Sequence, residues 1–319
     1  MLNKARIKLW SIGGGKGGVG KSILTLGLGI SLAQMGKKVI LIDGDLGGAN
    51  LHTLMGLRYP QVTLEDFLLR KVSRLEDIIL KTDIEGIGLI CGADDILGAA
   101  NPTYSQKIRL IQQIEELPAD FVLLDLGAGT SFNTLDLFNF SPGKIAIFTS
   151  QVTSLQNVYG FIKSALFRKL SRDFSRDEDV LNFLYQMGTK DPEVNLNSIK
   201  DLGDKLKEAA PDKFARLLNA VREFHLYLLV NMVKSRQDLK AAEIIQAVCQ
   251  DFLSVEPQVL GHLVYDPAVE TAVNQMTPFP LLYRKSKATA SLQQIANEFL
   301  MSCRLATHLS PRLEPSPAY

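Results

Sequence analysis

The sequence predicts a single doubly wound α/β domain, with a mostly parallel sheet and helices on both faces. First, short apolar runs alternate with longer segments of helical periodicity along most of the chain. Second, several of these runs end in acids or glycines, and ligands bind at the carboxyl ends of the strands in such sheets. Third, the chain has 319 residues with 46% hydrophobic content, which suffices for one sizeable core. We expect the domain to span residues 1–304, with an irregular tail over 305–319.

A glycine-rich segment lies between the first expected strand, Ile7–Ile12, and a buried helix that begins at Ser22. Gly15 and Gly20, followed directly by Lys-Ser, have the spacing of a P-loop. Glycines let backbone N–H groups approach phosphate oxygens, and a helix N-terminus favours the same anion. Lys21 would reach the β and γ phosphates, and the Ser22 hydroxyl would bind Mg²⁺. The residues expected to contact the nucleotide here are Gly15, Lys16, Gly17, Gly18, Val19, Gly20, Lys21, Ser22 and Ile23.

A second lysine, Lys16, lies inside the same loop. The run Lys-Gly-Gly-Val-Gly-Lys-Ser that starts there resembles the deviant Walker A motif of the MinD/ParA ATPases. That resemblance implies ATP and Mg²⁺ as ligands and a homodimer that forms with ATP. It also implies that Lys16 contacts the nucleotide of the partner subunit, so that both Lys16 and Lys21 act in hydrolysis.

The next apolar run, Val39–Ile42, is typical of a buried parallel strand and leads to Asp43 and Asp45 at its carboxyl end. Two acids separated by one glycine can both face a metal–phosphate site. We expect Asp43 to face Mg²⁺ and Asp45 to face an attacking water. In the resembled family, the second acid of this switch I segment positions or activates the hydrolytic water.

A third acid follows the apolar run Phe121–Leu124, in the Walker B pattern of a central strand that carries a carboxylate, Asp125, towards the metal. Gly127 and Gly129 follow and suit a mobile switch II loop that senses the γ phosphate. The run Asp-Leu-Gly-Ala-Gly resembles the flagellar-number regulators of the family, FlhG/FleN-like proteins. Before this motif we expect a Thr63-capped helix over 63–70, a strand over 86–92 and a helix over 104–117.

After a strand at Ile145–Phe148 and a helix through Lys169, residues 171–224 form a charged segment of helical spacing. Two interpretations stay open: a solvated helical elaboration or a docking surface for a partner. Arg168 and Arg172, with Lys169, make a small basic group that suits either.

The strand Leu226–Val233 returns the chain to the sheet. The resemblance implies that Asn231 hydrogen-bonds adenine, and an amide offers the donor and the acceptor that adenine requires. Asp266 and Pro267 resemble the last nucleotide-facing turn of the family fold. A helix over 288–303 follows and would cover the sheet.

Charge balance, cysteine content and the C-terminal residues limit the classes of function that the sequence supports. The 35 Lys and Arg against 34 Asp and Glu give no support to nucleic-acid binding. The 3 cysteines, distant in sequence, form no CxxC pair and suit a reducing cytoplasm. MinD proteins add a basic amphipathic membrane helix at the end; the corresponding residues here hold three prolines, which argues against membrane attachment.

The favoured function is a Mg²⁺-dependent ATPase that works as an ATP-driven dimerisation switch. Its output would be the placement of flagella, the division site, chromosomes or another cargo, read by an unknown protein partner. One alternative is an iron–sulfur carrier or reductase on the same fold, against which the lack of a CxxC pair argues. The other is a bacterial tyrosine kinase-like protein, whose terminal tyrosine cluster is here only Tyr319.

Overall fold

The computed structural model describes residues 8–57, 61–92, 102–188 and 198–309; at 186–188 and 304–309 it describes the backbone alone. Within these ranges an 8-stranded sheet has the order β3-β4-β2-β5-β1-β6-β7-β8. All neighbours pair in parallel except β3 and β4. The strands are β1 Leu9–Gly13, β2 Val39–Gly44, β3 Leu80–Lys81, β4 Ile87–Ile90, β5 Phe121–Leu126, β6 Gly143–Thr149, β7 Leu226–Val233 and β8 Gln258–Val264.

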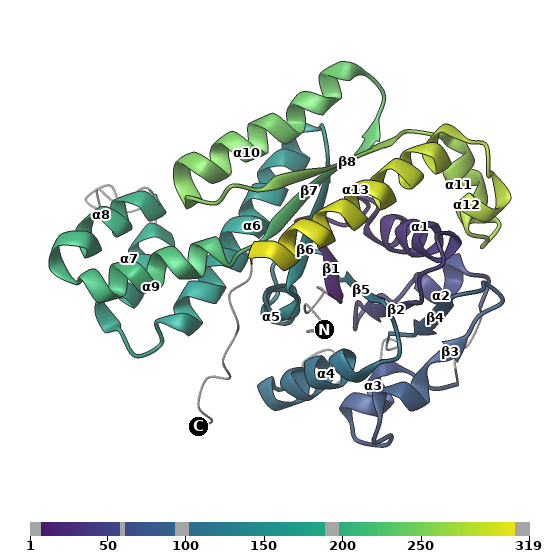
Figure 1. Cartoon of the computed structure of the whole chain (residues 1–319), viewed down its shortest axis with the longest axis horizontal. Coiled ribbons are helices and arrows are strands. Elements are labelled where there is room, and N and C mark those ends of the chain that lie inside the picture. Colours follow the sequence, from purple (N-terminus) through teal and green to yellow (C-terminus); the bar gives the residue numbers. More distant parts are fainter. Residues whose placement is uncertain (1–7, 58–60, 93–101, 189–197, 310–319) are drawn as a thin grey trace.

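Helices cover both faces of the sheet (Figure 1). The helices of the first half of the chain are α1 Lys21–Gln34, α2 Leu51–Leu54, α3 Leu64–Leu68, η1 Leu75–Ile78, α4 Tyr104–Glu116, α5 Phe132–Phe140 and α6 Val152–Asp173. The later helices are α7 Glu178–Gly188, α8 Ile199–Ala209, α9 Pro211–Arg222, η2 Arg236–Leu239, α10 Lys240–Leu253, α11 Pro267–Asn274, α12 Phe279–Leu282 and α13 Lys287–Leu309.

The central strand β5 explains why two layers of helix are needed. Val122 and Leu124 pack into the cluster under α4, α5, α6 and α10, whereas Phe121 and Leu123 pack into the cluster under α1 and α13. A strand that is apolar on both faces must be covered twice, which is the rule for parallel sheets. Trp10 anchors the second cluster, with its ring centroid 4.5 Å from that of Phe299 on α13. The doubly wound fold predicted from the sequence is confirmed.

Most expected elements occur close to their expected bounds. β7 coincides with the predicted range, and Thr63 caps α3 through a capping box with Asp66. The expected last helix is longer than predicted, since α13 runs to Leu309. Residues 305–309 are therefore helical rather than irregular, because no proline interrupts the chain before Pro311. The rest of the expected tail, 310–319, lies outside the described residues.

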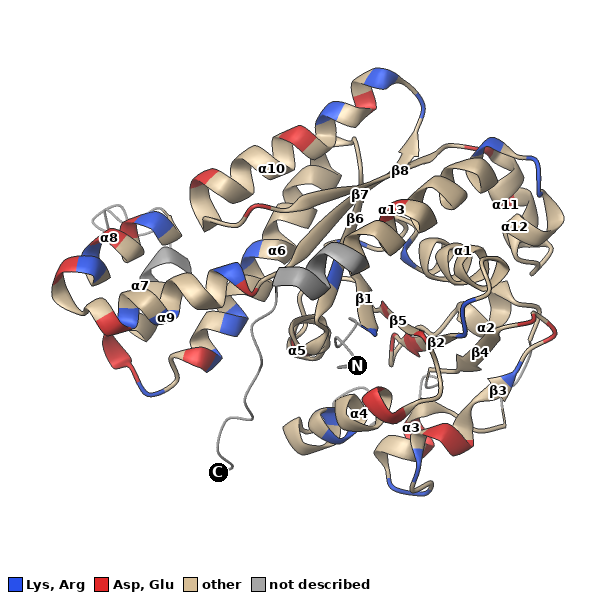
Figure 2. Ribbon diagram, viewed as in Figure 1, with Lys and Arg blue, Asp and Glu red and all other residues tan. Residues whose placement is uncertain are grey.

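The charged segment after α6 forms α7, α8 and α9, which project from one end of the domain (Figure 1). Basic and acidic residues are interspersed along these helices (Figure 2). α9 contacts α6 and α8 contacts α10, so the elaboration packs on the same face as α5 and α6. Over the described part of the chain, none of the helices has the length and hydropathy that crossing a membrane requires.

Candidate functional site

The glycine-rich loop connects β1 to α1 at the carboxyl edge of the sheet, as the motif predicts. Gly20 is the N-cap of α1, with φ 93° in the left-handed region, and a Cβ there would lie 2.2 Å from Nδ2 of Asn231. Side-chain hydroxyls cap α4, α5 and α8, but no side chain of a described residue caps α1. Its first N–H groups therefore suit an anionic ligand. Lys21, only 8% exposed, is the first residue of this helix.

Two buried carboxyls lie beneath this helix N-terminus. Asp43 at the end of β2 is paired in register with Asp125 at the end of β5, and their exposures are 0% and 2%. Burial raises the pKa of both; the charge of Asp45 raises that of Asp43 further, and the charge of Asp43 raises that of Asp125 further. Ser22 and Thr25 hydrogen-bond to Asp125, which opposes this rise in its pKa. A hydroxyl and two carboxyls are the hard oxygen donors that Mg²⁺ prefers, so these residues fit the expected metal.

Asp43 also shapes the loop that follows it. Its Oδ2 accepts hydrogen bonds from the N–H groups of Asn50 at 2.8 Å and Leu51 at 2.9 Å, and its Oδ1 accepts one from Asp45 at 3.2 Å. The expected switch I segment is therefore folded back over its own strand. This leaves Asp45 half-buried beside the second switch loop, where a Cβ on Gly127 would lie 3.0 Å from Asp45 Oδ1. The two expected switch loops are thus in contact.

A pocket of about 650 Å³ opens over these groups. Of the predicted residues its lining includes Gly17, Gly18, Gly20, Lys21, Ser22, Ile23, Asp45, Asn231 and Asp266. Outside the lining are Gly15, Lys16, Val19, Asp43, Asp125, Gly127, Gly129 and Pro267. Among these, Val19 is buried beneath the loop, whereas Lys16 is exposed. The P-loop, the segment after β2, the segment after β5 and strand β7 thus line a single pocket.

Asn231 makes a contact that sequence reasoning missed. Its Nδ2 donates to the carbonyl oxygen of Val19 at 2.7 Å, and its Oδ1 accepts from the N–H of Met232 at 2.8 Å. The amide therefore supports the P-loop from β7, and its second N–H has no acceptor among the described residues. Its expected role in reading adenine stays a prediction.

Asp266 and Pro267 have mainly structural contacts. The Asp266 carboxylate caps α11, accepting from the N–H of Ala268 at 3.0 Å, and it also accepts from Ala288 at 3.3 Å. Pro267 is the first residue of α11. Only the position of Asp266 in the pocket lining agrees with the expected nucleotide-facing turn; Pro267 lies outside that lining.

The far wall of the pocket contains apolar residues that the motifs did not indicate. Met232, Tyr265, Val269 and Val273 line it. The Lys234 ammonium lies 4.6 Å from the centroid of the Tyr265 ring. A signal existed for two of them, since Val269 and Val273 are four residues apart and share one face of α11. This wall suits a flat apolar group beside the phosphate end.

Comparison with known proteins identifies the family. Residues 10–279 match the model described as the CobQ/CobB/MinD/ParA nucleotide binding domain. The chain belongs to this family. A relative within it is the antiactivator FleN of Pseudomonas aeruginosa, 23% identical over 295 residues, or 92% of this chain and 86% of FleN. The flagellum site-determining protein YlxH of Helicobacter pylori is 29% identical over 163 residues, or 50% of this chain and 54% of YlxH.

The family resemblance stated from the loop sequence is confirmed, and flagellar regulators are among the relatives. Some relatives, such as YlxH and the putative septum site-determining MinD proteins of Oltmannsiellopsis viridis and Chlorella vulgaris, are matched over only 48% to 54% of their length. The fold resembles that of MinD from Pyrococcus horikoshii, which was solved as a complex with Mg-ADP. The TM-score is 0.63 at 21% identity, over 92% of this chain and 95% of that MinD.

Proposed function

We propose that this protein is a Mg²⁺-dependent ATPase in which ATP closes two copies into a dimer and hydrolysis releases them. The observation that carries the proposal is the uncapped N-terminus of α1 above two buried carboxyls, Asp43 and Asp125. Such a pair is unfavourable by itself, because burial and Asp43 raise the pKa of Asp125 more than the Ser22 hydrogen bond and the Lys21 charge lower it. A phosphate chain with a divalent cation removes that cost.

The phosphates of ATP would lie along the loop from Gly17 to Ser22, with the adenine towards the apolar wall at Met232 and Tyr265. Ser22 and Asp125 would hold Mg²⁺, with Asp43 behind them. When bound, this ion neutralises charge on the phosphate oxygens. Lys21 would contribute a fixed positive charge next to the same oxygens.

Hydrolysis needs a positioned water and further charge neutralisation. Asp45 lies in the pocket lining beside Gly127, where its carboxylate can orient a water for in-line attack on the γ phosphorus. Lys16 is exposed at the rim of the loop, outside the pocket of its own chain. In a face-to-face dimer it would neutralise phosphate charge in the opposite site.

The output of the switch would be spatial, read by a protein partner. A FleN antiactivator and a flagellum site-determining YlxH are among its relatives, so placement or number of flagella is the process we favour. Division-site and cargo placement are the other processes within this proposal. For the iron–sulfur alternative the cysteines give no support, since Cys91, Cys249 and Cys303 are buried in separate parts of the fold. For the kinase alternative, Tyr319 lies outside the described residues.

Solution mass tests the switch. We expect a monomer with ADP and a dimer with a non-hydrolysable ATP analogue and Mg²⁺. Lys16→Ala should keep nucleotide binding and lose the dimer. The control is Lys38→Ala, which should behave like the wild type because Lys38 is an exposed lysine before β2, at the opposite edge of the sheet. A solution mass that is the same with ADP and with the ATP analogue would contradict the proposal. So would a Lys16→Ala protein whose mass still doubles with the analogue.

A further inference from the structure

A group of aromatic and arginine side chains lies on α5 and α6, away from the nucleotide pocket. Phe132, Asp136 and Phe140 recur every four residues and share one side of α5. The Arg168 guanidinium lies 4.4 Å from the ring centroid of Phe132, and that of Arg172 lies 4.4 Å from that of Phe140. Phe132 is 69% exposed and Tyr104 of α4, 6.0 Å from Phe140, is 57% exposed. We call Tyr104, Phe132, Phe140, Arg168 and Arg172 the α5–α6 face.

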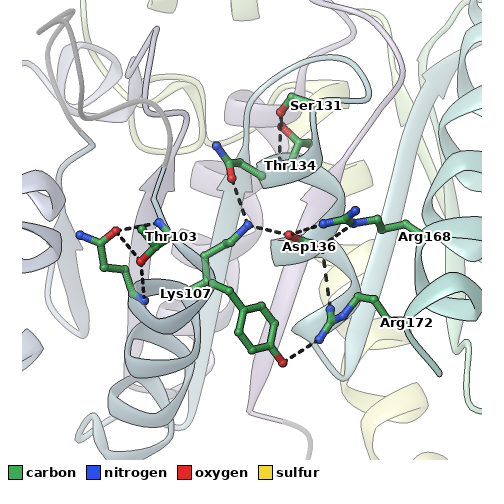
Figure 3. Close-up of polar contacts among 10 residues, drawn as sticks. Thr103, Lys107, Ser131, Thr134, Asp136, Arg168 and Arg172 are labelled. Atoms are coloured by element: carbon green, nitrogen blue, oxygen red, sulfur yellow. Dashed lines mark hydrogen bonds and ion pairs between the residues drawn. The ribbon is translucent and has the colours of Figure 1, made fainter. Parts of the chain in front are cut away.

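Among the described residues, the charges on this face do not balance. Asp136, 1% exposed, accepts from Lys107 Nζ at 2.6 Å and from Arg168 Nε at 2.8 Å, and Arg172 Nη1 lies 3.9 Å from it (Figure 3). Three cations therefore share one carboxylate. Asp136 and Lys107 are buried, so the excess positive charge is at Arg168 and Arg172, whose side chains are each 31% exposed.

A second arginine stack in the protein shows what a balanced arrangement looks like. The Arg216 guanidinium lies 4.6 Å from the ring centroid of Phe174, as in the α5–α6 face. However, Arg216 Nη1 donates to Asp177 at 2.9 Å, and Lys213, which lies 3.3 Å from Asp177, is also 3.7 Å from Asp179, so that two cations share two carboxylates. By contrast, no described carboxylate other than Asp136 lies within ion-pair distance of Arg168 or Arg172.

We propose that the α5–α6 face binds an acidic segment of a partner protein, with one apolar side chain against Phe132 and another against Tyr104, which lies beside Phe140 at the other end of α5. Stacked guanidinium groups keep their outer N–H groups in a fixed fork, which suits carboxylates. Exposed aromatic side chains next to arginine are the composition of interface hot spots. Nucleic acid is a poorer fit, because it needs a row of phosphate contacts and the neighbouring Lys169 is already paired with Asp173 at 2.8 Å.

This face is also placed to report the nucleotide state, a step that rests on the proposed switch. Gly129 ends the expected switch II loop with φ 87°, and Ser131 then caps α5 by accepting from the N–H of Thr134 at 3.2 Å. Phe132 is the first residue of the helix. A change in switch II therefore moves the N-terminal end of the face directly, so an acidic partner would bind the ADP and ATP states with different affinities.

Fluorescence anisotropy of a short labelled peptide tests the proposal. The probe is rich in glutamate with two central leucines, and its copy carries glutamine in place of each glutamate. We expect the acidic probe to bind the wild-type protein. The glutamine copy should bind it about tenfold or more weakly, and Phe132→Ala and Arg172→Gln should each weaken binding of the acidic probe about tenfold or more. Arg216→Gln removes the balanced stack and Tyr185→Ala removes an equally exposed aromatic, 70% against 69%, so neither should change binding. Circular dichroism melts verify that each variant folds.

Three results would overturn the inference: no binding of the acidic probe, equal binding of its glutamine copy, or tighter binding of single-stranded DNA of matched charge that the same variants weaken. The link to the switch is tested separately, by measuring the affinity for the acidic probe with ADP and with the ATP analogue. Equal peptide affinity in both states, in protein whose mass does double, would overturn the link. A mass that never doubles would instead remove the switch, while the peptide result would still decide the surface.

Discussion

Asp125 and Asp136 show two ways in which one residue type is buried. Burial would raise the pKa of Asp136, but hydrogen bonds from Arg168 and Lys107 outweigh it and hold that pKa below its usual range. At Asp125, burial and the neighbouring Asp43 raise the pKa, and the bonds from Ser22 and the charge of Lys21 do not compensate. The first carboxyl already has its cations. The second lies in a site that a ligand would complete, which is the usual distinction between a structural and a functional acid.

Removing the Asn231 amide separates its two candidate roles. Asn231→Ala deletes the bond to the Val19 carbonyl, so the P-loop loses support and ATP affinity should fall about tenfold. If the amide only supports the loop, GTP affinity should fall by the same factor. If it also reads adenine, the preference for ATP over GTP should shrink. Titration of the wild type and the variant with both nucleotides distinguishes the roles, and unchanged affinity for both would reject each of them.

Asp45→Ala should accumulate the ATP-bound dimer, because nucleotide contacts remain while the water loses its orienting carboxylate. The measurement is the lifetime of the dimer after ATP addition, with phosphate release followed in parallel. Asp120→Ala, at the opposite end of β5, is the control and should turn over normally. Rapid phosphate release by the Asp45 variant would remove this residue from the role.

At the scale of elements, α5 connects the site to the rest of the fold. It begins directly after the expected switch II loop, and its one buried acid contacts α4 through Lys107 and α6 through Arg168 (Figure 3). Three helices that are separate in sequence are therefore joined at one carboxylate. A buried charge of this kind adds little net stability when intact, but it is costly to break because its partners lose their counter-charge.

Asp136→Asn tests this junction. We expect a loss of about 3 kcal/mol in the free energy of unfolding at pH 7, measured by urea denaturation, because Lys107 stays buried without its carboxylate. The folded-state pKa of Asp136 is lowered, so its contribution is present above the unfolded pKa and is lost as pH falls. The difference between wild type and variant should thus shrink below about pH 4. Asp173→Asn, in an exposed pair with Lys169, should change stability by less than about 0.5 kcal/mol.

For the whole molecule, the parallel sheet decides which motifs meet. The order β2-β5-β1 puts Asp43, Asp125 and the P-loop on three adjacent strands, and β7 brings Asn231 to the other side of the loop. All of these groups lie at the carboxyl edge, where the strands end and the backbone groups are open to a ligand. Folding and ligand binding are therefore coupled through the same residues.

Asp125→Asn should have opposite effects without and with ligand. In the free protein burial and Asp43 raise the pKa of Asp125, so folding at neutral pH carries the cost of protonating this carboxyl; the neutral amide avoids that cost, and the melting temperature should rise. With Mg²⁺ and ADP at about one hundred times Kd, the wild type should gain about 2.7 kcal/mol and the variant much less. Chelation of Mg²⁺ should reduce the wild-type gain, whereas an equal gain for both proteins would exclude Asp125 from the metal site.

The sequence alone determined the family, the P-loop, the three acids and most of the elements. These features are local: a glycine spacing, an apolar run that ends in an acid, or a hydroxyl at a helix start is set by neighbours along the chain. The length of the last helix was underestimated because the prolines of the tail predict an early end, whereas the first of them is Pro311 and no stop signal precedes it. The apolar wall at Met232 and Tyr265 was missed for a similar reason, since exposed apolar residues carry no periodicity.

Only the tertiary structure decided which groups are partners. Asn231 meets Val19 across 212 positions of sequence, and Asp136 meets Arg168 across 32. No local pattern specifies such pairs, because each depends on the order of strands and on how two helices cross. The same holds for charge balance: the basic group on α6 is ordinary in the sequence, and only its packing around a single buried carboxylate leaves two arginines with positive charge at the surface.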